Sequence, residues 1–592
     1  MMPWLPEWVA PWDRLVAGAA VGLPLVMALF ALAPGKLRLR FGLVPLAVLP
    51  ALGLAMAPPV SVTWPELLLG TTFETGGGRS LWLGVTALLW LCAGWFGTYY
   101  LAHDEHRHRY AFYFLGAMAG NFGVALSRDP ASFFTAFAVM SVLSYGLVIH
   151  DGTPASRQAG RVYLGMAVLG EVLQFAALAK LLFPMFGKGN GIDFQGLEMA
   201  SASDPLTVGL FVVGFGIKAG LLGLHVWLPM AHPVAPTPAS AVLSGSMIKA
   251  GLIGWMMFLP LGTMVLPGAS SALIVLGLAG ALTAAVFGVV QSHPKAVLAY
   301  SSVSQMGLII TAIGVGLGAP TVWAEMKWVV LVYAAHHGFA KCLLFLSVGL
   351  RTSRPLAGVE NTLFWAGTLF AGLALIGAPF TSGAIAKSLL KDTVAYAGLA
   401  HGDVVLALLT VGAIGTTLLM TRFALTLRGL DSHGHEPAGK GIWAPWLVLL
   451  ILVMGFTLGV AHELAKPETY LMVKTTPWWK ALWPMAAGLG LYALGGRALQ
   501  AGWGRGITIP PGDLYIGLVA ALRRTARATQ PFRLRLARTW DALSEHHDRK
   551  ARAWGAEAIR SLIRLENGLV AWSMGSLAAL VAAVVIFALA SR

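Results

Sequence analysis

The sequence predicts an all-α, polytopic membrane protein. Its 592 residues are 57% hydrophobic and only 11% charged, with a mean hydropathy of +0.73, whereas soluble domains carry about 25% charged residues. Apolar stretches of about 20 residues, each long enough to cross a bilayer as a helix, recur along nearly the whole chain. Before about residue 500, no segment is polar enough to form a separate soluble domain.

Polar loops divide these stretches into about 16 expected transmembrane helices, counted by the 20-residue criterion. The first three helices fall within residues 1–109, and helices 14 and 15 fall within 431–499. The expected centres lie near residues 24, 50, 90, 118, 140, 172, 217, 248, 280, 307, 338, 370, 413, 450, 488 and 578.

Basic residues gather in alternate loops, and this pattern predicts the orientation of the chain. If the N-terminus lies outside, the loops rich in lysine and arginine fall inside, as the positive-inside rule requires. Topology and contact with anionic lipid therefore explain much of the net charge of +15, which does not indicate nucleic acid binding. We expect a multi-pass protein of the cell (inner) membrane. The inside loops are 36–40, 103–109, 150–161, 292–295, 351–355 and 428–440.

Residues 500–566 differ from the rest because they are strongly basic. Apolar residues such as Leu536, Trp540 and Leu543 recur at helical spacing, and the other face is rich in arginine. A basic amphipathic helix of this kind usually lies along a membrane surface or against a partner, although a solvated basic loop has the same composition. Residues 567–592 then return to the membrane as the last span.

Lys218, in the middle of an apolar run, is the first candidate for function. A lysine at this depth costs roughly 2.5–3.5 kcal/mol. His225 and His232 follow at seven-residue intervals, which would place all three side chains near one helical face. The prolines from Pro229 to Pro238 cannot continue an ordinary helix, and broken helices at membrane depth are buried or line a watery cavity. The patch therefore predicts an interrupted helix with a proton-active face.

Further lysines and histidines lie within or at the edge of other apolar segments. Lys249 belongs to the next span, and His336, His337 and Lys341 belong to a later one. His337 and Lys341 are four residues apart, so a helix places them on one face. Histidine titrates near neutral pH and suits a proton relay.

Serines precede this pair in the sequence. Ser301, Ser302 and Ser304 can form hydrogen bonds between helices or hold water. Lys295, which comes just before them, is expected to be a charge of an inside loop.

A second helix break comes before Lys387. Pro379 and Gly383 bound the break, and Lys391 follows Lys387 by one helical turn. Ionisable residues spread over several membrane helices mark routes for ions or protons, so the series as a whole predicts such a route.

Together, these motifs resemble the antiporter-like subunits of respiratory complex I and of Mrp-type sodium/proton antiporters. They are Lys218, HVWLPMA and PTPASA before residue 242, KAVLAYSSVSQMG at 295–307 and HGFAKCLLF at 337–345. The resemblance covers about residues 100–430. The sequence AHPVAPTPASAVLSGSMIKAG is closest to the branch found in membrane-bound hydrogenases and formate hydrogenlyases.

The resemblance implies two inverted five-helix repeats, each with broken helices, which is a common plan of transporters. The first repeat would be residues 110–260, with helices 4–8, and the second residues 261–430, with helices 9–13. Lys218 and Lys387 would then occupy corresponding broken helices. The basic segment 500–566 would be a short form of the lateral helix of the largest such subunits.

One position departs from the family pattern. The family usually carries a glutamate in its fifth helix, seven residues before a tyrosine, and this chain has Ala138 there. The acid expected to pair with Lys218 is therefore absent. Glu171, one helix later, either takes over this role or is a structural acid. If nothing substitutes, this half of the channel is modified or inactive.

We therefore expect a proton- or cation-translocating subunit of a larger complex, with no catalysis, bound cofactor or metal of its own. The expected partners are other membrane subunits and a peripheral redox or uptake module. One alternative is a non-translocating anchor for a catalytic partner, and another is an ion-coupled subunit of a solute (inorganic carbon) uptake system. The expected pathway residues are Glu171, Lys218, His225, Lys249, His336, His337, Lys341, Lys387 and Lys391.

Other metal-binding residue types in the chain do not form a recognisable site. The run at 103–109 could bind metal, but a solvated loop is favoured because the spacing of a structural site is missing. Cys92 and Cys342 show neither metal nor disulfide spacing and are expected in the core.

Overall fold

A computed structural model of the protein describes residues 9–68, 70–182, 204–430, 439–463 and 479–500. The chain divides into two compact units. The first comprises Met1–Trp64 and Gly70–Asp513, and the second comprises Pro65–Leu69 and Leu514–Arg592. All helices and strands named below belong to the first unit. The predicted basic segment, from residue 501 on, and the predicted last span lie outside the described residues.

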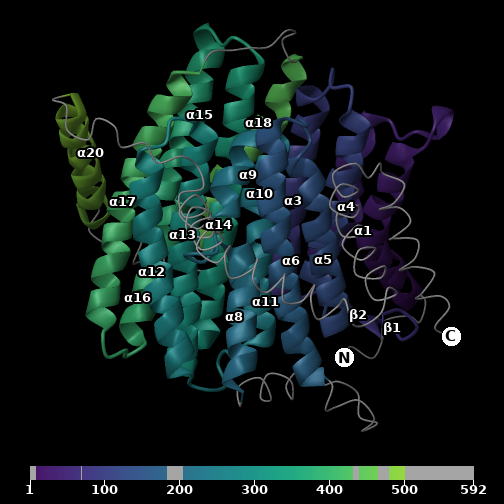
Figure 1. The fold of residues 1–592 in the computed structure, drawn as a ribbon, viewed down its shortest axis with the longest axis horizontal. Coiled ribbons are helices and arrows are strands. Elements are labelled where there is room, and N and C mark those ends of the chain that lie inside the picture. The colour runs from purple at the N-terminus through teal and green to yellow at the C-terminus, as the bar shows by residue number, and fades with distance from the viewer. Residues whose placement is uncertain (1–8, 69, 183–203, 431–438, 464–478, 501–592) are drawn as a thin grey trace, which may run out of the picture. The chain divides into compact units, whose positions relative to one another are not determined.

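The N-terminal part of the first unit is mostly helical, and its helices pack side by side (Figure 1). The α-helix α1 packs against α2 and α4, and α3 packs against α2. A single hairpin interrupts the helices. The elements are α1 (Val9–Leu32), the 3-10 helices η1 (Gly35–Leu37) and η2 (Phe41–Val48), α2 (Leu49–Met56), β1 (Ser61–Trp64), β2 (Thr71–Glu74) and α3 (Gly78–Tyr100).

The hairpin is the one part of the described fold that differs in type from the all-α prediction. β1 and β2 are antiparallel, with Val62 opposite Phe73 and Thr63 opposite Thr72. Their valine, threonine and aromatic residues favour strands. The two threonine hydroxyls of the Thr63–Thr72 pair lie 3.1 Å apart.

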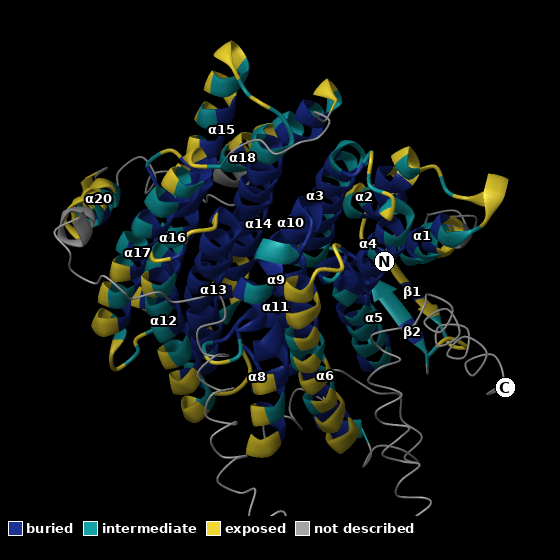
Figure 2. Cartoon of the chain, turned by 45° about the horizontal axis from the view of Figure 1, so that its top comes forward, coloured by how far each residue is buried: buried dark blue, intermediate teal, exposed yellow. Residues whose placement is uncertain are grey.

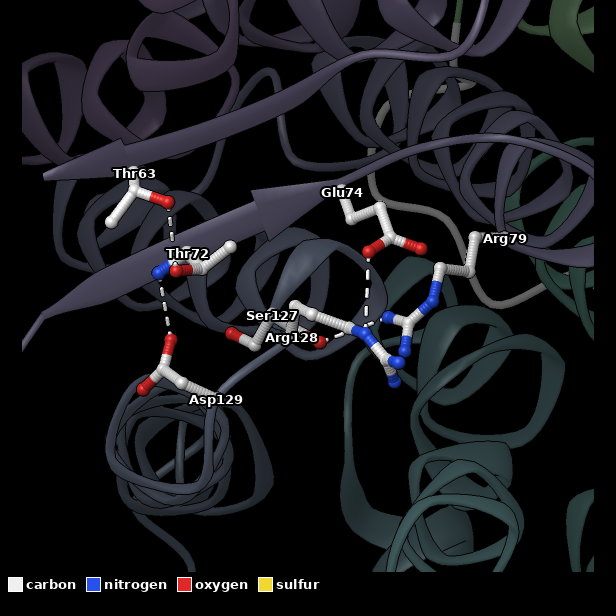
Figure 3. A network of polar contacts seen from close by, with 7 residues as sticks. All are labelled: Thr63, Thr72, Glu74, Arg79, Ser127, Arg128 and Asp129. Atoms are coloured by element: carbon white, nitrogen blue, oxygen red, sulfur yellow. Dashed lines mark hydrogen bonds and ion pairs between the residues drawn. The ribbon is translucent and has the colours of Figure 1, made fainter. Parts of the chain in front are cut away.

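Figure 3 shows how this hairpin is joined to the start of α5 (Pro130–Val148). The Asp129 carboxylate accepts a hydrogen bond from the Thr72 backbone N–H (2.8 Å) and another from the Ser132 N–H (2.7 Å). It therefore holds β2 and caps the N-terminus of α5 at once. Further links are the Arg128–Glu74 ion pair (3.2 Å) and the hydrogen bond from Arg79 to the Ser127 carbonyl (2.9 Å).

The next helices, α4 (Arg107–Leu126), α5 and α6 (Pro154–Leu182), pack in sequence order. The α4–α5 contact is close because Gly120 has no side chain: an added Cβ would lie 2.4 Å from the Met140 backbone nitrogen. Backbones can approach this closely only where small residues face each other, as is common between membrane helices.

The segment after residue 204 contains the predicted helix breaks. The helix α8 (Pro205–Ala219) ends at Gly220, whose φ of 76° is left-handed and favours glycine. A turn leads to α9, and a further interruption at Ser246 separates α10 from α11. The elements are α9 (Trp227–Val234), α10 (Thr237–Gly245), the 3-10 helix η4 (Met247–Lys249) and α11 (Ala250–Phe258).

The core of the first unit is formed by α13 (Pro294–Gly318) and α14 (Trp323–Ser353), which are buried along most of their length (Figure 2). The polar side chains of α13 and α14 therefore face protein, and their hydrogen bonds must be made inside the bundle. α12 (Pro267–Val289) packs along α13 on the outside.

A second broken helix lies among the remaining described helices. α15 (Gly358–Ile376) ends at Gly377, which is left-handed with a φ of 88°, and α16 (Ser382–Tyr396) begins five residues later. The break predicted between Pro379 and Gly383 is thus confirmed. The last helices are α17 (Gly402–Arg428), α18 (Trp443–Glu463) and α20 (Trp479–Gln500), with the 3-10 turns η5 (Pro320–Val322) and η6 (Lys440–Ile442) before α14 and α18.

Among the described residues, 12 helices are long and apolar enough to span a membrane. The exact prediction of 16 spans is not confirmed. Near the expected centres 118 and 488 lie the helices α4 and α20, which are not among the twelve, and near 217 lies α8, a shorter apolar helix. The span expected near 578 lies outside the described residues. A mostly helical, polytopic membrane fold is confirmed.

Candidate functional site

The Lys218 side chain is buried, with 4% of its surface exposed, in the last turn of α8. Its Nζ donates to the Tyr163 hydroxyl (3.0 Å) and to the Ser141 hydroxyl (3.2 Å). The ammonium also faces three rings, with Nζ 5.3 Å from the centroid of Tyr163, 5.7 Å from Trp227 and 6.0 Å from Phe137. Hydroxyls and aromatic faces therefore surround this cation.

Glu171 lies on α6, close to this cation. Its carboxylate is hydrogen-bonded with Ser141 and interacts electrostatically with Lys218. The Ser141 hydroxyl thus contacts both charged groups. The carboxylate Oε1 is buried and has no hydrogen-bond partner among the described residues. Ala138, the position of the family's usual acid, supplies no polar side chain.

The predicted single helical face for Lys218, His225 and His232 is wrong. The chain leaves the helix at Gly220, so His225 lies in the turn before α9 and His232 lies on α9 itself. Glycine at φ 76° ends α8 because the left-handed conformation cannot continue it. Both histidines are buried, with 1% and 0% of their surfaces exposed, respectively.

Lys249 is fully buried at the end of η4, where the helix of α10 and α11 is interrupted. Its Nζ donates to the Ser244 carbonyl (2.5 Å), which lies at the end of α10. The hydroxyls of Ser244 and Ser302 are 2.7 Å apart, which joins this break to α13. Electrostatic interactions link Lys249 with His336, His337 and Lys341 on α14.

Lys341 and His337 share one face of α14 and are both fully buried. The Lys341 Nζ donates to the Leu298 carbonyl (2.5 Å) and the Ser301 hydroxyl (2.8 Å) of α13. Both ring nitrogens of His337 lack hydrogen-bond partners among the described residues. An imidazole without fixed partners is free to take a proton at one nitrogen and release it at the other.

His336 connects α14 with the second broken helix. Its Nδ1 lies 2.8 Å from the Ser382 hydroxyl at the start of α16. The ring stacks against Tyr333, whose hydroxyl donates to Gln305 on α13 (2.9 Å). The Gln305 amide in turn donates to Thr416 on α17 (2.8 Å).

Lys387 and Lys391 extend the polar groups along α16. The Lys387 Nζ donates to the carbonyls of Leu375 (2.8 Å) and Ile376 (2.7 Å), the last residues of α15. Helix C-termini leave carbonyls unsatisfied and carry partial negative charge, so this end of α15 stabilises the ammonium. Lys391 donates to the Thr410 hydroxyl of α17 (2.8 Å).

Lys218, Lys249, Lys341 and Lys387 thus share a bonding pattern. Within the described ranges, their hydrogen-bond partners are hydroxyls and backbone carbonyls, not carboxylates. Neutral dipoles hold a cation in place without fixing its proton as strongly as an ion pair would. The arrangement can therefore pass a proton along a series of groups rather than bind one permanently.

Several residues of this site had no signal in the sequence. Tyr163, Ser141 and Trp227 surround Lys218 but come from three different helices, and only tertiary packing brings them together. Lys295, expected in an inside loop, is instead 7% exposed in the first turn of α13 and donates to the Ala235 carbonyl (2.8 Å). The predicted helix-to-helix contacts of Ser301, Ser302 and Ser304 are present.

The described part of the chain holds no group of three or more histidine, cysteine or acidic side chains suited to a metal ion. The candidate site residues are instead basic groups and hydroxyls, together with the Glu171 carboxylate.

A sequence model of the family described as "NADH:quinone oxidoreductase/Mrp antiporter, TM" matches residues 127–414. Over this segment, the chain belongs to the NADH:quinone oxidoreductase/Mrp antiporter family. This membership and the 12 apolar helices among the described residues identify a multi-pass membrane protein.

Relatives of this antiporter family member include hydrogenase and antiporter components. Hydrogenase-4 component B of Escherichia coli (strain K12) is 27% identical over 409 residues, which cover 64% of this chain and 60% of that protein. Putative antiporter subunit mnhA2 of Staphylococcus aureus (strain JH9) is 25% identical over 428 residues, covering 66% of this chain and 53% of that protein. The chain thus spans about half to three-fifths of the length of these relatives.

Solved structures share the fold of this family member. One is the Mrp complex from Dietzia sp. DQ12-45-1b, with a TM-score of 0.70, 22% identity, and coverage of 95% of this chain and 63% of that chain. Another is the membrane-bound sulfane sulfur reductase, an archaeal respiratory membrane complex, with a TM-score of 0.64, 18% identity, and coverage of 93% and 99%. At these identities, the similarity is one of fold.

Proposed function

We propose that this chain is a proton-translocating membrane subunit of a larger complex and has no catalytic chemistry of its own. A cation such as sodium is the second possible cargo. The proposal is supported by family membership over residues 127–414 and by relatives named as a hydrogenase component and an antiporter subunit. The structural relatives are parts of multi-subunit membrane complexes, which supports other membrane subunits as partners.

The observation that carries the proposal is the run of buried and half-buried basic groups from Lys249 to Lys391, together with the buried Lys218 on α8. From Lys249 it continues to His337 and Lys341, and through His336 to Lys387. Buried lysines are costly in a membrane protein and are kept where they serve a pathway. Hydroxyls of α13 and α17 lie beside the run and supply additional groups that both accept and donate protons.

Energy would reach this run as a change of charge in a partner subunit. A charge that appears beside one lysine changes the free energy of its ammonium form, and a proton moves to relieve the change. The same perturbation then acts on the next basic group. We propose an inner-membrane complex in which a peripheral redox or uptake module supplies the charge.

In this proposal, Glu171 replaces the acid missing at Ala138. The Ser141 hydroxyl contacts both Glu171 and Lys218, so it couples the acid to the cation without a direct ion pair. The first half of the pathway would then remain active despite the alanine.

The test is proton transport by membrane vesicles that carry the full chain with its partner subunits. Lys218→Met, Lys341→Met and Lys387→Met should each lower the proton-to-electron ratio by at least half while the complex still assembles. Lys327→Met is the matched control, because Lys327 is exposed on α14, the helix that carries buried Lys341. Normal ratios in all three of these lysine variants would contradict the proposal and favour a non-translocating anchor, for which the absent acid at Ala138 is the specific argument.

A further inference from the structure

A histidine–aspartate pair at one face of the bundle lies outside the run of basic groups from Lys249 to Lys391. The His150 Nε2 lies 3.1 Å from the Asp104 carboxylate, and the two side chains are 2% and 28% exposed, respectively. The Arg109 guanidinium donates to the His150 carbonyl (2.8 Å) and fixes the backbone of this loop. Asp104 thus faces water while its partner is buried. The hydrogen bond from His150 lowers the pKa of the Asp104 carboxyl, so this carboxyl is ionised at neutral pH.

Asp151 and Lys295 lie next to this pair. Asp151 follows His150 in the chain and interacts electrostatically with His150, Asp104 and Lys295. Partial burial raises the pKa of the Asp151 carboxyl, which makes it a better proton acceptor than a fully solvated aspartate. Lys295 is buried in the first turn of α13, and its Nζ donates to the Ala235 carbonyl at the end of α9 (2.8 Å).

His232, one turn earlier on α9, connects this region with the centre of the bundle. It interacts electrostatically with both Lys295 and Lys341. Its ring stacks on Phe345, with centroids 4.7 Å apart, and the Lys341 Nζ lies 5.8 Å from the centroid of the same Phe345 ring. His232 therefore sits between a lysine near the surface and a lysine at the core.

The histidines of this region do not have the bonding of purely structural groups. Both ring nitrogens of His232, and the Nδ1 of His150, are buried and have no hydrogen-bond partner among the described residues. Leaving a buried polar atom unsatisfied costs about 1–3 kcal/mol. A nitrogen left open in this way is available to accept a proton from a neighbouring group.

We infer that Asp104, His150, Asp151 and Lys295 form an entrance through which protons from this face reach His232 and Lys341. The inference rests on the proposed function. Each transfer breaks an O–H or N–H bond on one group and forms one on the next, so one proton is taken from water and no oxidant or reductant is needed. His150 accepts at one ring nitrogen and releases at the other, and His232 repeats this step at the inner end.

Charged and aromatic groups surround His150. Beside Asp104 and Asp151, Arg109 binds its carbonyl and the Tyr110 ring packs edge-on at 5.3 Å. His106 lies in the same loop and interacts with Asp104. In this inference, proton uptake on this face passes between two carboxylates, Asp104 and Asp151, beside the cationic Arg109.

The experiment measures proton uptake from this face in vesicles that carry the full chain with its partner subunits. Asp104→Asn, His150→Ala and Lys295→Gln should each slow uptake at least fivefold. Added imidazole should restore uptake in His150→Ala, which a structural role would not allow. Glu360→Gln is the control, because the Arg354–Glu360 pair (3.2 Å) is a comparable partly exposed ion pair that includes none of the four entrance residues, and it should be silent.

The amount of assembled complex and its melting temperature identify any variant that fails to fold. Imidazole rescue is then decisive, because it compares uptake by the same His150→Ala protein with and without imidazole. Proton uptake at the normal rate in the entrance variants, or no rescue by imidazole, would overturn the inference of an entrance. If Lys341→Met still lost transport, the proposed function would remain supported. Normal transport in both Lys218→Met and Lys341→Met would overturn the proposed function itself.

Discussion

At the scale of single residues, the protein holds Lys218 with an unusual set of partners. Two hydroxyls and the faces of Phe137, Tyr163 and Trp227 surround the ammonium. Cation–π contacts in desolvated sites are worth about 2 kcal/mol or more, so the rings offset part of the cost of burying the charge. They favour the ammonium without donating or accepting a proton, which leaves the proton to Ser141 and Tyr163.

Glu171→Gln should impair transport as much as Lys218→Met. The amide keeps the size of the side chain but removes the negative charge that interacts with the lysine through Ser141. Vesicle proton transport measures the effect, with Glu325→Gln as the control because Glu325 is exposed in the first turn of α14. A silent Glu171→Gln would make the carboxylate structural and leave the first half of the pathway without an acid.

The Asp104–His150 pair should make stability depend on pH in the acid range. Because the hydrogen bond from His150 lowers the Asp104 pKa in the folded state, the stabilisation is present above the unfolded value of about 3.9. It is lost as pH falls through the lower folded value. Asp104→Asn should cost about 0.5–1 kcal/mol at neutral pH, and the gap in melting temperature should close on acidification. A gap of constant size would contradict this assignment.

At the scale of elements, the second broken helix depends on glycines that permit close contact. An added Cβ at Gly383 would lie 1.8 Å from the Ala374 carbonyl and 2.9 Å from the His336 Nε2. Gly377 is left-handed, and a Cβ there would lie 3.0 Å from the Lys387 Cδ. The end of α15, the start of α16 and two pathway side chains are therefore packed against one another.

Gly383→Ala should destabilise this break by about 3 kcal/mol or more, since backbone must move to relieve the contact. Gly372→Ala, in the interior of α15, is the matched control because nothing lies within 4 Å of its added Cβ; alanine there should be neutral or stabilising by up to about 1 kcal/mol. Thermal unfolding and vesicle transport give the comparison. Equal melting temperatures for the two variants would refute the packing argument.

At the scale of the whole molecule, the proposed pathway joins the basic groups of both halves in one series. If protons pass through Lys218 and Lys387 in turn, Lys218→Met and Lys387→Met should each stop most transport. The double variant should then be no worse than the poorer single one, because groups that act in one process are not additive. Vesicle transport by the singles and the double decides the matter. Singles that each keep about half of the rate, with none left in the double, would indicate two independent routes.

The sequence predicted the large features because they depend on local composition. Apolar runs of bilayer length predicted most spans, and glycine and proline predicted the break before Lys387. The partners of Lys218 could not be predicted, since Ser141 and Tyr163 come from other helices and no spacing rule relates them. The prediction that Lys295 lies in an inside loop was wrong for a similar reason, because its burial depends on α9 covering the start of α13.

The partners of the buried lysines have a consequence for the timing of transport. A hydroxyl, as at Lys218 with Ser141 and Tyr163, can accept a proton on one side and give one up on the other after a rotation. A backbone carbonyl, as at Lys249 and Lys387, only accepts. In the proposed pathway, a lysine bonded to hydroxyls passes its proton on, whereas a lysine bonded to backbone carbonyls retains its proton for longer. The residence time of a proton is then set at Lys249 and Lys387, where the two helix breaks leave carbonyls exposed inside the protein.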